Sequence, residues 1–476
     1  MPSYHDYLQS QADMQDRLND FLSIQAGRLM FADLDPLALA NTYGSPLEVS
    51  FCPQITRRVH EMQSLFAKLR EQLGYAGQFV YAYATKANFA EQVIRTAISA
   101  GAHYETSSPF DVRIATSLYK NGILPADHFV FCNGSKEPAY IDAILALRRS
   151  GFANVVPILD DPEEFEALAV CELPLLLGLR ERKDATDLRE GATYGYDRFG
   201  MSADVMQTLA QRVASTRHTI ILYHAMVGSQ LEDEAFFIHE TRESLQGFAK
   251  LREHAPNMRY FNFGGGFPTS AYSLDFDFDY TATIRALLEA VADECRQCNI
   301  GVPHLVGEFG RYTVADHGLH IFHTRRRKSA QSGLDGALPW YLIDGSLMVA
   351  LPDILIVAGQ QFIALALNHW DAPAQPVLLG GRRTCDSDDF YPRDPQHGLL
   401  LPYVDAATLA REPLRIAFFG TGAYQGMLSG EGGAHHCLAP EAPHLIIEQQ
   451  HDQRTQRLIP EQSWEDVLGE LGYAHS

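Results

Sequence analysis

The sequence predicts an α/β fold joined to a β fold: a parallel (β/α)8 barrel followed by a C-terminal β-sandwich or barrel-like domain. Three observations favour this prediction. Between about Gln78 and Gly310, short apolar or β-branched runs alternate with longer segments of helical period, in about eight units. Nearly every run ends in a polar or glycine-rich cluster. After about His317 the helical period is lost, and short strands separated by Pro, Gly and Asp follow.

The apolar runs are short and rich in aromatic and β-branched residues, which is typical of buried parallel strands. The expected strands, in chain order, are Phe79–Ala84, Ala102–Glu105, Phe129–Cys132, Val155–Leu159, Leu175–Arg180, Thr219–Met226, Tyr260–Phe263 and His304–Glu308. The expected helices between them are Phe89–Ala100, Pro109–Tyr119, Glu137–Arg149, Ala203–Ser215, Glu232–His254 and Tyr280–Cys298. An open doubly wound sheet is the alternative that this alternation leaves.

Polar residues gather where the predicted strands end. The clusters are Thr85-Lys86, Glu105 to Ser108, Asn133-Gly134, Arg180, Gly228-Ser229, Gly264 to Gly266, and Glu308 with Gly310-Arg311. In a parallel barrel these ends converge on one face, which is the face that carries catalytic residues. We therefore expect the chemistry of the chain on this face.

The second half predicts an all-β domain. Its strand candidates are Ile354–Ala358, Gln361–Ala366, Val377–Leu379, Leu414–Phe419 and His444–Glu448. We expect a polar N-terminal segment over residues 1–28, a barrel over 46–317 and a β domain over 318–476. A strand from about residues 29–45 is expected to join the β domain.

Composition limits the classes of function. The chain has 59 acidic and 38 basic side chains and a net charge of −21, which repels nucleic acid and anionic membranes and mildly attracts cationic ligands. We find neither a signal peptide nor a run of the roughly 18 to 20 apolar residues that a membrane helix needs. Seven cysteines at irregular spacing do not form a disulfide framework. We therefore expect a cytoplasmic protein that binds neither nucleic acid nor membranes.

Lys86 follows the strand Phe79–Ala84 in the context Tyr-Ala-Thr-Lys-Ala-Asn. A lysine at the catalytic rim of a barrel could form a Schiff base with an aldehyde cofactor. A solvent-facing lysine at a strand end is the ordinary alternative.

The triplet Gly264, Gly265 and Gly266 follows another strand directly. Glycines let backbone N–H groups approach a phosphate, and late barrel strands commonly bind one. A tight turn is the alternative. After the next strand, Gly310 and Arg311 would add a further backbone donor and a guanidinium.

Glu308 ends that last strand. A carboxylate beside a pyridine nitrogen keeps the ring protonated, which makes the ring a stronger electron sink. The alternative is a structural pair with Arg311 or Arg180.

An acidic loop, Cys385 to Asp389, follows in the second domain. Its carboxylates could bind a distal cation, and its thiol could donate a proton. The cysteine pair Cys295 and Cys298 and the run His435 to Cys437 lack matching ligand clusters, so no metal site is expected.

Taken in order, these motifs resemble the barrel-type (fold-type-III) pyridoxal-phosphate decarboxylases that act on ornithine, arginine and diaminopimelate. The resemblance covers about Leu29 to about Leu445 and is closest to a bacterial arginine decarboxylase branch. The motifs that carry it are Glu105-Thr106-Ser107-Ser108-x-Phe110-Asp111, Phe261-Asn262-x-Gly264-Gly265-Gly266-Phe267-Pro268, Thr384-Cys385-Asp386-Ser387-Asp388-Asp389 and Gly422-Ala423-Tyr424-Gln425.

The resemblance implies a role for each matching position. Lys86 would hold pyridoxal 5'-phosphate covalently, and Glu308 would pair with its ring nitrogen, supported by Arg180 and Glu105. The phosphate would be held by Ser229, Gly265, Gly266, Gly310, Arg311 and Tyr424. Cys385 would return a proton to Cα across a dimer interface. The distal cation of the substrate would meet Asp344, Asp386 and Asp388. A homodimer with shared active sites is therefore implied.

Two departures from the family pattern stand out. The family's His-x-Gly-Ser, whose histidine stacks on the cofactor ring, is Met226-Val227-Gly228-Ser229 here, with His224 two residues earlier. Either Met226 or His224 would then pack on the ring. Glu-Pro-Gly-Arg is replaced by Glu308-Phe309-Gly310-Arg311.

The resemblance and the acidic loop together predict decarboxylation of a basic L-amino acid, L-arginine to agmatine and CO2, because a carboxylate pairs best with a guanidinium. Ornithine or lysine is the near alternative. A barrel-type racemase, with Lys86 and Tyr424 as opposing bases, and a non-catalytic regulator are the alternatives of other classes.

Overall fold

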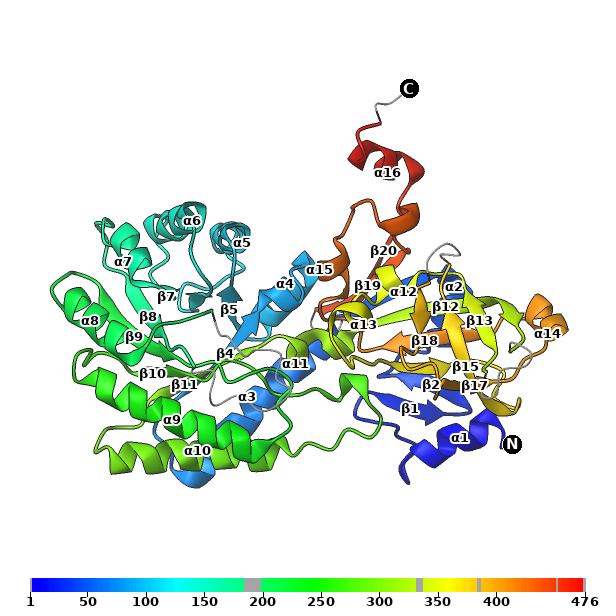
Figure 1. Ribbon diagram of the computed structural model, residues 1–476, viewed down its shortest axis with the longest axis horizontal. Coiled ribbons are helices and arrows are strands. Elements are labelled where there is room, and N and C mark those ends of the chain that lie inside the picture. The colour runs from blue at the N-terminus through cyan, green and yellow to red at the C-terminus, as the bar shows by residue number, and fades with distance from the viewer. Residues whose placement is uncertain (1, 184–197, 331–336, 383–386, 451–452, 474–476) are drawn as a thin grey trace. The chain divides into compact units, whose positions relative to one another are not determined.

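The chain folds into two compact units, which the computed structural model describes over residues 2–183, 198–330, 337–382, 387–450 and 453–473 (Figure 1). The β unit comprises Met1–Ile55, Thr269–Asp277 and Val314–Ser476. The barrel unit comprises Thr56–Pro268 and Phe278–Thr313. The β unit is thus assembled from three stretches of the chain.

The barrel unit is built on a closed barrel in the order β10-β11-β4-β5-β6-β7-β8-β9, and neighbouring strands are parallel. The strands are β4 (Phe79–Ala84), β5 (His103–Thr106), β6 (Val130–Cys132), β7 (Val155–Leu159), β8 (Leu176–Arg180), β9 (Thr219–His224), β10 (Tyr260–Asn262) and β11 (His304–Phe309). The predicted (β/α)8 barrel is confirmed. The predicted strand over Thr219–Met226 ends two residues early, which leaves Met226 in the following loop.

Helices follow the strands and surround the barrel (Figure 1). They are α4 (Glu91–Ser99), α5 (Pro109–Lys120), α6 (Pro138–Arg149), α7 (Pro162–Leu168), α8 (Ala203–Ala214), α9 (Glu234–Arg252), α10 (Tyr280–Gln297) and the short α11 (Arg311–Val314). Proline in the first turn and a side-chain cap start α5 and α7, where Ser108 and Asp161 accept backbone N–H groups. No helix among the described residues is long and apolar enough to cross a membrane.

Helix α3 (Pro53–Leu73) precedes the first barrel strand and was not predicted. Its buried side chains recur at helical spacing: Ile55, Val59, Met62, Phe66 and Leu69. The signal was therefore present in the sequence, but the many polar and charged residues between these positions obscure it.

The β unit is built on a mixed sheet in the order β16-β15-β13-β12-β3-β19-β20, and β18, β14 and β17 pair onto it. Its strands are β3 (Leu47–Phe51), β12 (Gly318–Lys328), β13 (Trp340–Ile343), β14 (Ile363–Ala366), β15 (Ala374–Gly380), β16 (Phe390–Tyr391), β17 (Leu399–Pro402), β18 (Arg415–Phe419), β19 (His444–Gln450) and β20 (Gln453–Ile459). Its helices are α1 (Tyr4–Gln11), α2 (Pro36–Tyr43), α12 (Leu347–Ala350), α13 (Asp353–Ile356), α14 (Ala406–Arg411), α15 (Gln425–Ser429) and α16 (Trp464–Glu470). The predicted C-terminal β domain is confirmed.

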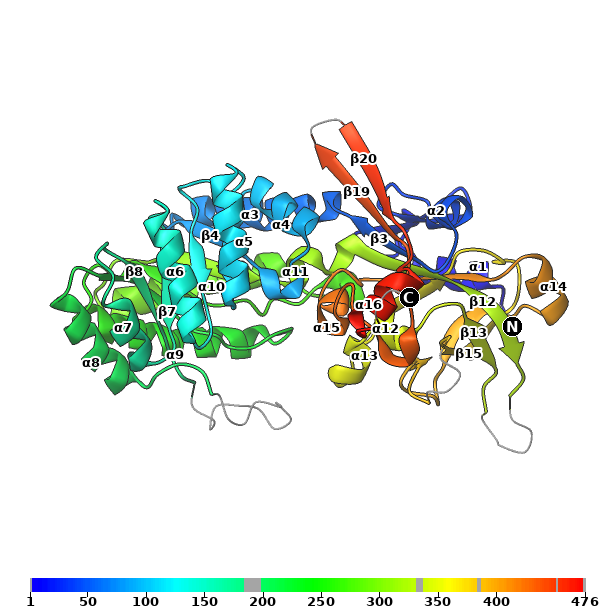
Figure 2. The ribbon, with the colours of Figure 1, turned by 90° about the horizontal axis from the view of Figure 1, so that it is seen from above.

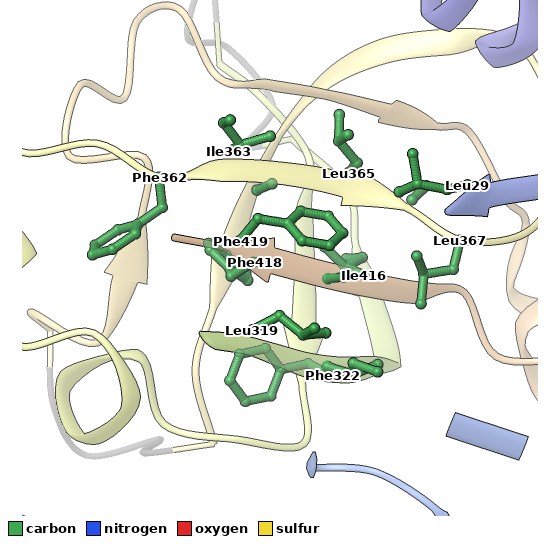
Figure 3. Close-up of a cluster of buried hydrophobic side chains, with 14 of the residues drawn as sticks. Leu29, Leu319, Phe322, Phe362, Ile363, Leu365, Leu367, Ile416, Phe418 and Phe419 are labelled. Carbon is green, nitrogen blue, oxygen red and sulfur yellow. The ribbon is translucent and has the colours of Figure 1, made fainter. Parts of the chain in front are cut away.

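The core of the β unit is aliphatic and aromatic. Figure 3 shows Phe418 and Phe419 of β18 between side chains of β12 and β14. The last two strands form a hairpin that extends from the rest of this unit (Figure 2). One strand prediction is wrong: Ile354–Ala358 contains the single helical turn α13, because Pro352 and Asp353 favour a helix start there.

The first 28 residues, expected to be a separate polar segment, contribute to the β unit. The capping box of Ser3 and Asp6 starts α1, which buries Tyr4 and Leu8. The backbone N–H of Ala366 in β14 donates to the Tyr4 hydroxyl at 3.0 Å. β1 (Leu22–Gln25) and β2 (Arg28–Phe31) then form a hairpin. The start of the chain is therefore part of a folded core.

Replacing Leu8 by alanine should lower the free energy of unfolding by about 2–5 kcal/mol, because it leaves a cavity in this core. The exposed Met14 offers a matched control, and Met14→Ala should change it by less than about 0.5 kcal/mol. Urea titration followed by tryptophan fluorescence measures both, because all three tryptophans, Trp340, Trp370 and Trp464, belong to the β unit. Equal stability of the two variants would contradict a structural role for the N-terminal segment.

Candidate active site

The barrel strands carry the predicted cofactor residues at their carboxyl ends. Lys86 lies in a 3-10 turn, η1 (Thr85–Ala87), directly after β4 and is exposed. Glu105 lies in β5 and Glu308 in β11, on either side of β4, and both are buried. The parallel pairing therefore puts a lysine and two carboxyl groups at one end of three adjacent strands.

Glu308 is held by two asparagine side chains. The Asn262 Nδ2 group, at the end of β10, donates to Glu308 Oε1 at 2.6 Å. The Asn133 Nδ2 group, just after β6, lies 3.0 Å from each carboxylate oxygen of Glu308. These donors stabilise the charged form of a buried carboxylate, which is otherwise costly.

The same Asn133 amide nitrogen donates to Glu105 Oε1 at 2.8 Å. Burial, and next the negative charge of Glu308, raise the pKa of Glu105 to about 8. Both effects favour the protonated form of Glu105, while Glu308 accepts hydrogen bonds from two amide groups.

His224 and Met226 occupy different places. His224 ends β9 inside the barrel, and its Nε2 lies 3.6 Å from Glu308 Oε2. Burial lowers the pKa of His224 to about 4, so its ring is neutral. Neither ring nitrogen has a hydrogen-bond partner among the described residues. Met226 lies in the loop, and its sulfur occupies the space that a β-carbon on Gly264 would need.

The glycine triplet makes close backbone approaches that only glycine permits. A β-carbon on Gly265 would overlap the carbonyl oxygen of Glu308, and one on Gly266 would overlap that of Gly228. Gly264 and Gly266 also have positive φ angles of 71° and 99°. The backbone after β10 can therefore approach the backbone of β11 and of the loop after β9 closely, because no side chain stands between them.

The remaining predicted residues of the barrel unit lie at the ends of β8, β9 and β11. Ser229 is exposed in the loop after β9, and Gly310 connects β11 to α11, which begins at Arg311. Arg180 ends β8; its guanidinium carbon lies 4.6 Å from the Phe199 ring centroid, and its Nε has no partner within the described chain.

Taken together, these residues fit a cofactor with a phosphate and a protonated ring nitrogen. The glycine turns would hold the phosphate, and the carboxylate of Glu308 would accept a hydrogen bond from the protonated ring nitrogen. The unsatisfied nitrogens of His224 and Arg180 are polar groups in the same strand ends that a bound group could satisfy.

Asp344 belongs to the β unit and is buried there. It accepts hydrogen bonds from Ser45 Oγ at 2.8 Å and from the His323 backbone at 2.9 Å, and His323 Nδ1 lies 2.8 Å from it. It lines a cavity of about 620 Å³ within this unit. Eight carboxylic residues line the same cavity: Glu48, Asp344, Glu431, Glu441, Glu461, Glu465, Asp466 and Glu470. Arg382, His320, His435 and His444 line it as well, so acidic side chains outnumber basic ones along its wall.

The other predicted residues of the β unit have mixed outcomes. Cys385 and Asp386 lie outside the described residues. Asp388 is exposed, and its carboxylate lies 3.4 Å from Arg393. Asp389 is buried and accepts the Leu347 and Met348 N–H groups that begin α12, at 2.6 and 3.0 Å. Tyr424 has a left-handed backbone (φ 69°) and precedes α15.

Sequence reasoning assigned no role to four residues that shape the barrel end. Asn133 stood in a strand-end cluster and Asn262 in the predicted strand Tyr260–Phe263, but neither received a function. Lys136 and Glu164 form a buried ion pair at 3.0 Å, and Lys136 Nζ also donates to the carbonyls of Gly134 and Ile158. A Lys four residues beyond a strand end was the available signal. No cluster of three potential metal ligands occurs among the described residues.

Comparisons with known proteins agree with this geometry. The family model described as pyridoxal-dependent decarboxylase, pyridoxal binding domain, matches residues 54–315. The biosynthetic arginine decarboxylase of Thermosynechococcus vestitus is 25% identical over 297 residues, which is 58% of this chain and 46% of that protein. Biosynthetic arginine decarboxylase 1 of Synechocystis sp. is 24% identical over 309 residues, 59% of this chain and 43% of that protein. The match thus spans about half the length of these curated relatives.

Two solved structures share the fold. The biosynthetic arginine decarboxylase of Campylobacter jejuni has a TM-score of 0.81 at 17% identity and covers 99% of this chain and 92% of its own. The diaminopimelate decarboxylase of M. jannaschii has a TM-score of 0.77 at 19% identity, with 95% and 98% covered. The family match covers more than half of the sequence and includes the barrel strands with Lys86, Glu105 and Glu308. This chain belongs to the pyridoxal-dependent decarboxylase family and carries its pyridoxal phosphate-binding barrel.

Proposed function

We propose that this chain decarboxylates a basic L-amino acid with pyridoxal 5'-phosphate, and that the substrate is L-arginine, which gives agmatine and CO2. The observation that carries the proposal is the group at the barrel's strand ends: an exposed Lys86 directly after β4 and, on the neighbouring strand β11, a buried Glu308 that accepts hydrogen bonds from two asparagine amides. Similarity to arginine decarboxylases over the barrel supports the choice of reaction.

Pyridoxal phosphate, when bound, supplies the electron sink for the pair left by the departing carboxylate. Lys86 would hold it, and Glu308 would keep its ring nitrogen protonated. The phosphate would be held by residues of the barrel unit, namely Ser229, Gly265, Gly266, Gly310 and Arg311. We also assign this role to Tyr424 of the β unit. Arg180 and Glu105 would support the ring-nitrogen end.

The ring face departs from the family pattern. His224 lies within the barrel beside Glu308, whereas Met226 lies in the loop that follows. We therefore assign Met226 to the packing of the cofactor ring, and His224 to the support of Glu308. A thioether supplies apolar contact and excludes water without adding a titrating group.

The substrate's side chain would be recognised by carboxylates. Asp344 lines an acidic cavity, and the arginine among its described lining residues, Arg382, lies 3.9 Å from Glu461. Such a wall suits a guanidinium or ammonium group better than the distal carboxylate of diaminopimelate. Asp386 and Asp388 would complete this recognition, and Cys385 would return the proton to Cα. We further propose a homodimer whose protomers share these residues.

Incubation of the cofactor-loaded protein with single amino acids tests the reaction. L-arginine, L-ornithine, L-lysine and meso-diaminopimelate are offered separately, and products are identified by mass spectrometry. Agmatine should dominate, and Lys86→Ala should abolish its formation because the cofactor loses its covalent attachment. Putrescine or cadaverine as the main product would support decarboxylation but identify ornithine or lysine, and not arginine, as the substrate. Release of no amine, or an undiminished Lys86→Ala variant, would overturn the proposal.

Replacing Gly265 by alanine should weaken cofactor binding by at least about tenfold, equivalent to roughly 1.4 kcal/mol, because the new β-carbon displaces the Glu308 backbone. Gly301→Ala is the matched control, since no atom lies within 4 Å of a β-carbon there. Equilibrium dialysis against pyridoxal phosphate measures both affinities. Equal affinities would show that the close approach of Gly265 to Glu308 does not position the cofactor.

A further inference from the structure

Two carboxyl groups meet one amide nitrogen at the barrel end. Asn133 Nδ2 lies 2.8 Å from Glu105 and 3.0 Å from both oxygens of Glu308. The three side chains come from β5, the end of β6 and β11, and all are at least nine-tenths buried. Because each carboxyl is one hydrogen bond from the same nitrogen, the two carboxyls lie within two hydrogen-bond lengths of each other.

Two negative charges so close together in a buried site repel strongly, so such a pair retains a proton. The surroundings decide where that proton resides. Glu308 receives a second amide donor, Asn262, at 2.6 Å. For Glu105, Asn133 is the side-chain donor that the described part of the chain provides. The charge is therefore better solvated on Glu308 and the proton better kept on Glu105.

The other ionisable groups around Glu105 do not reverse this order. Lys86 lowers the pKa of Glu105, and Asp111 raises it; both effects are smaller than those of burial and Glu308. Tyr104, Cys132 and Tyr140 also face Glu105, and burial raises the pKa of each, so they remain neutral. On the other side of the pair, His224 is neutral because burial lowers its pKa.

We propose that Asn133 is a positioning residue that joins Glu105 and Glu308 into a pair carrying a single negative charge, with the proton stored on Glu105 and the charge on Glu308. The pair presents a fixed anion where the ring nitrogen of pyridoxal phosphate would bind, whichever amino acid is the substrate. The carboxyl that stores the proton, Glu105, is hydrogen-bonded to Asn133. The Oδ1 atom of Asn133 is buried and has no partner among the described residues.

Infrared difference spectroscopy of the full-length chain tests the pair directly, because a protonated carboxyl has a C=O stretch separate from that of a carboxylate. Without cofactor, one buried protonated carboxyl should be present at pH 6 and should titrate with a midpoint well above the ordinary pKa of a glutamate. The isosteric Glu105→Gln variant should lose this band. Glu240→Gln, which changes another buried glutamate, should keep it.

Two further variants should move the midpoint in opposite directions. Asn133→Ala removes a donor that stabilises the charged form of Glu105, so the midpoint should rise. Glu308→Gln removes the neighbouring negative charge, so the midpoint should fall. Survival of the band in Glu105→Gln, its absence at pH 6, or equal shifts in both variants would overturn the proposal.

The outcome is separable from that of the amine assay. A chain that released no amine but retained the Glu105 band would overturn the proposed reaction and leave the pair intact. Conversely, agmatine formation by a chain that lacked the band would overturn the proposal of a singly charged pair and support the proposed reaction. As a second readout, the absorbance of the loaded cofactor should depend on pH near the midpoint of the pair and lose this dependence in Glu105→Gln.

Discussion

The hydrogen bonds that Glu308 receives are the interaction on which the rest of the barrel end depends. A carboxylate at the end of a buried strand costs several kcal/mol unless donors surround it. Asn262 and Asn133 supply these donors from neighbouring and distant strands, which requires the closed parallel barrel to bring β6, β10 and β11 together at one end. The glycines after β10 allow that approach, since any side chain at Gly265 would meet the Glu308 carbonyl.

A second buried pair supports the same end from β7. The ammonium of Lys136 is fully enclosed and paired with Glu164, and two backbone carbonyls accept its other hydrogen bonds. Glu164 also accepts the backbone N–H groups of Lys136 and Asp160, so it connects the loops after β6 and β7. Loss of one partner would strand a charge in the interior, at a cost of about 3–5 kcal/mol. Asn133 precedes this lysine by three residues, so the pair fixes the loop that presents its amide.

Much of this was predictable because parallel strands and their ends leave local signals. The eight apolar runs predicted the barrel strands to within about two residues, and the polar clusters placed Lys86, Glu105 and Glu308 at one end. What failed depends on tertiary context. Asn133 and Asn262 acquire their roles only through contacts 175 and 46 residues away in sequence. Asp389 was expected among the carboxylates that bind the substrate, yet its Oδ1 accepts the backbone N–H of Leu347 at the start of α12. The polar start of the chain hid Tyr4 and Leu8, whose burial depends on a sheet more than 300 residues later.

Borohydride reduction of the cofactor-loaded protein, followed by peptide mapping, tests the central claim most directly. Reduction fixes pyridoxal phosphate to the amine that holds it, and the barrel geometry predicts a phosphopyridoxyl group on Nζ of Lys86 in stoichiometric amount. Lys136 provides an internal comparison, because its ammonium is enclosed by Glu164 and backbone carbonyls and should remain unmodified. Label on another lysine, or none on Lys86, would contradict the assignment of this barrel end as the cofactor site.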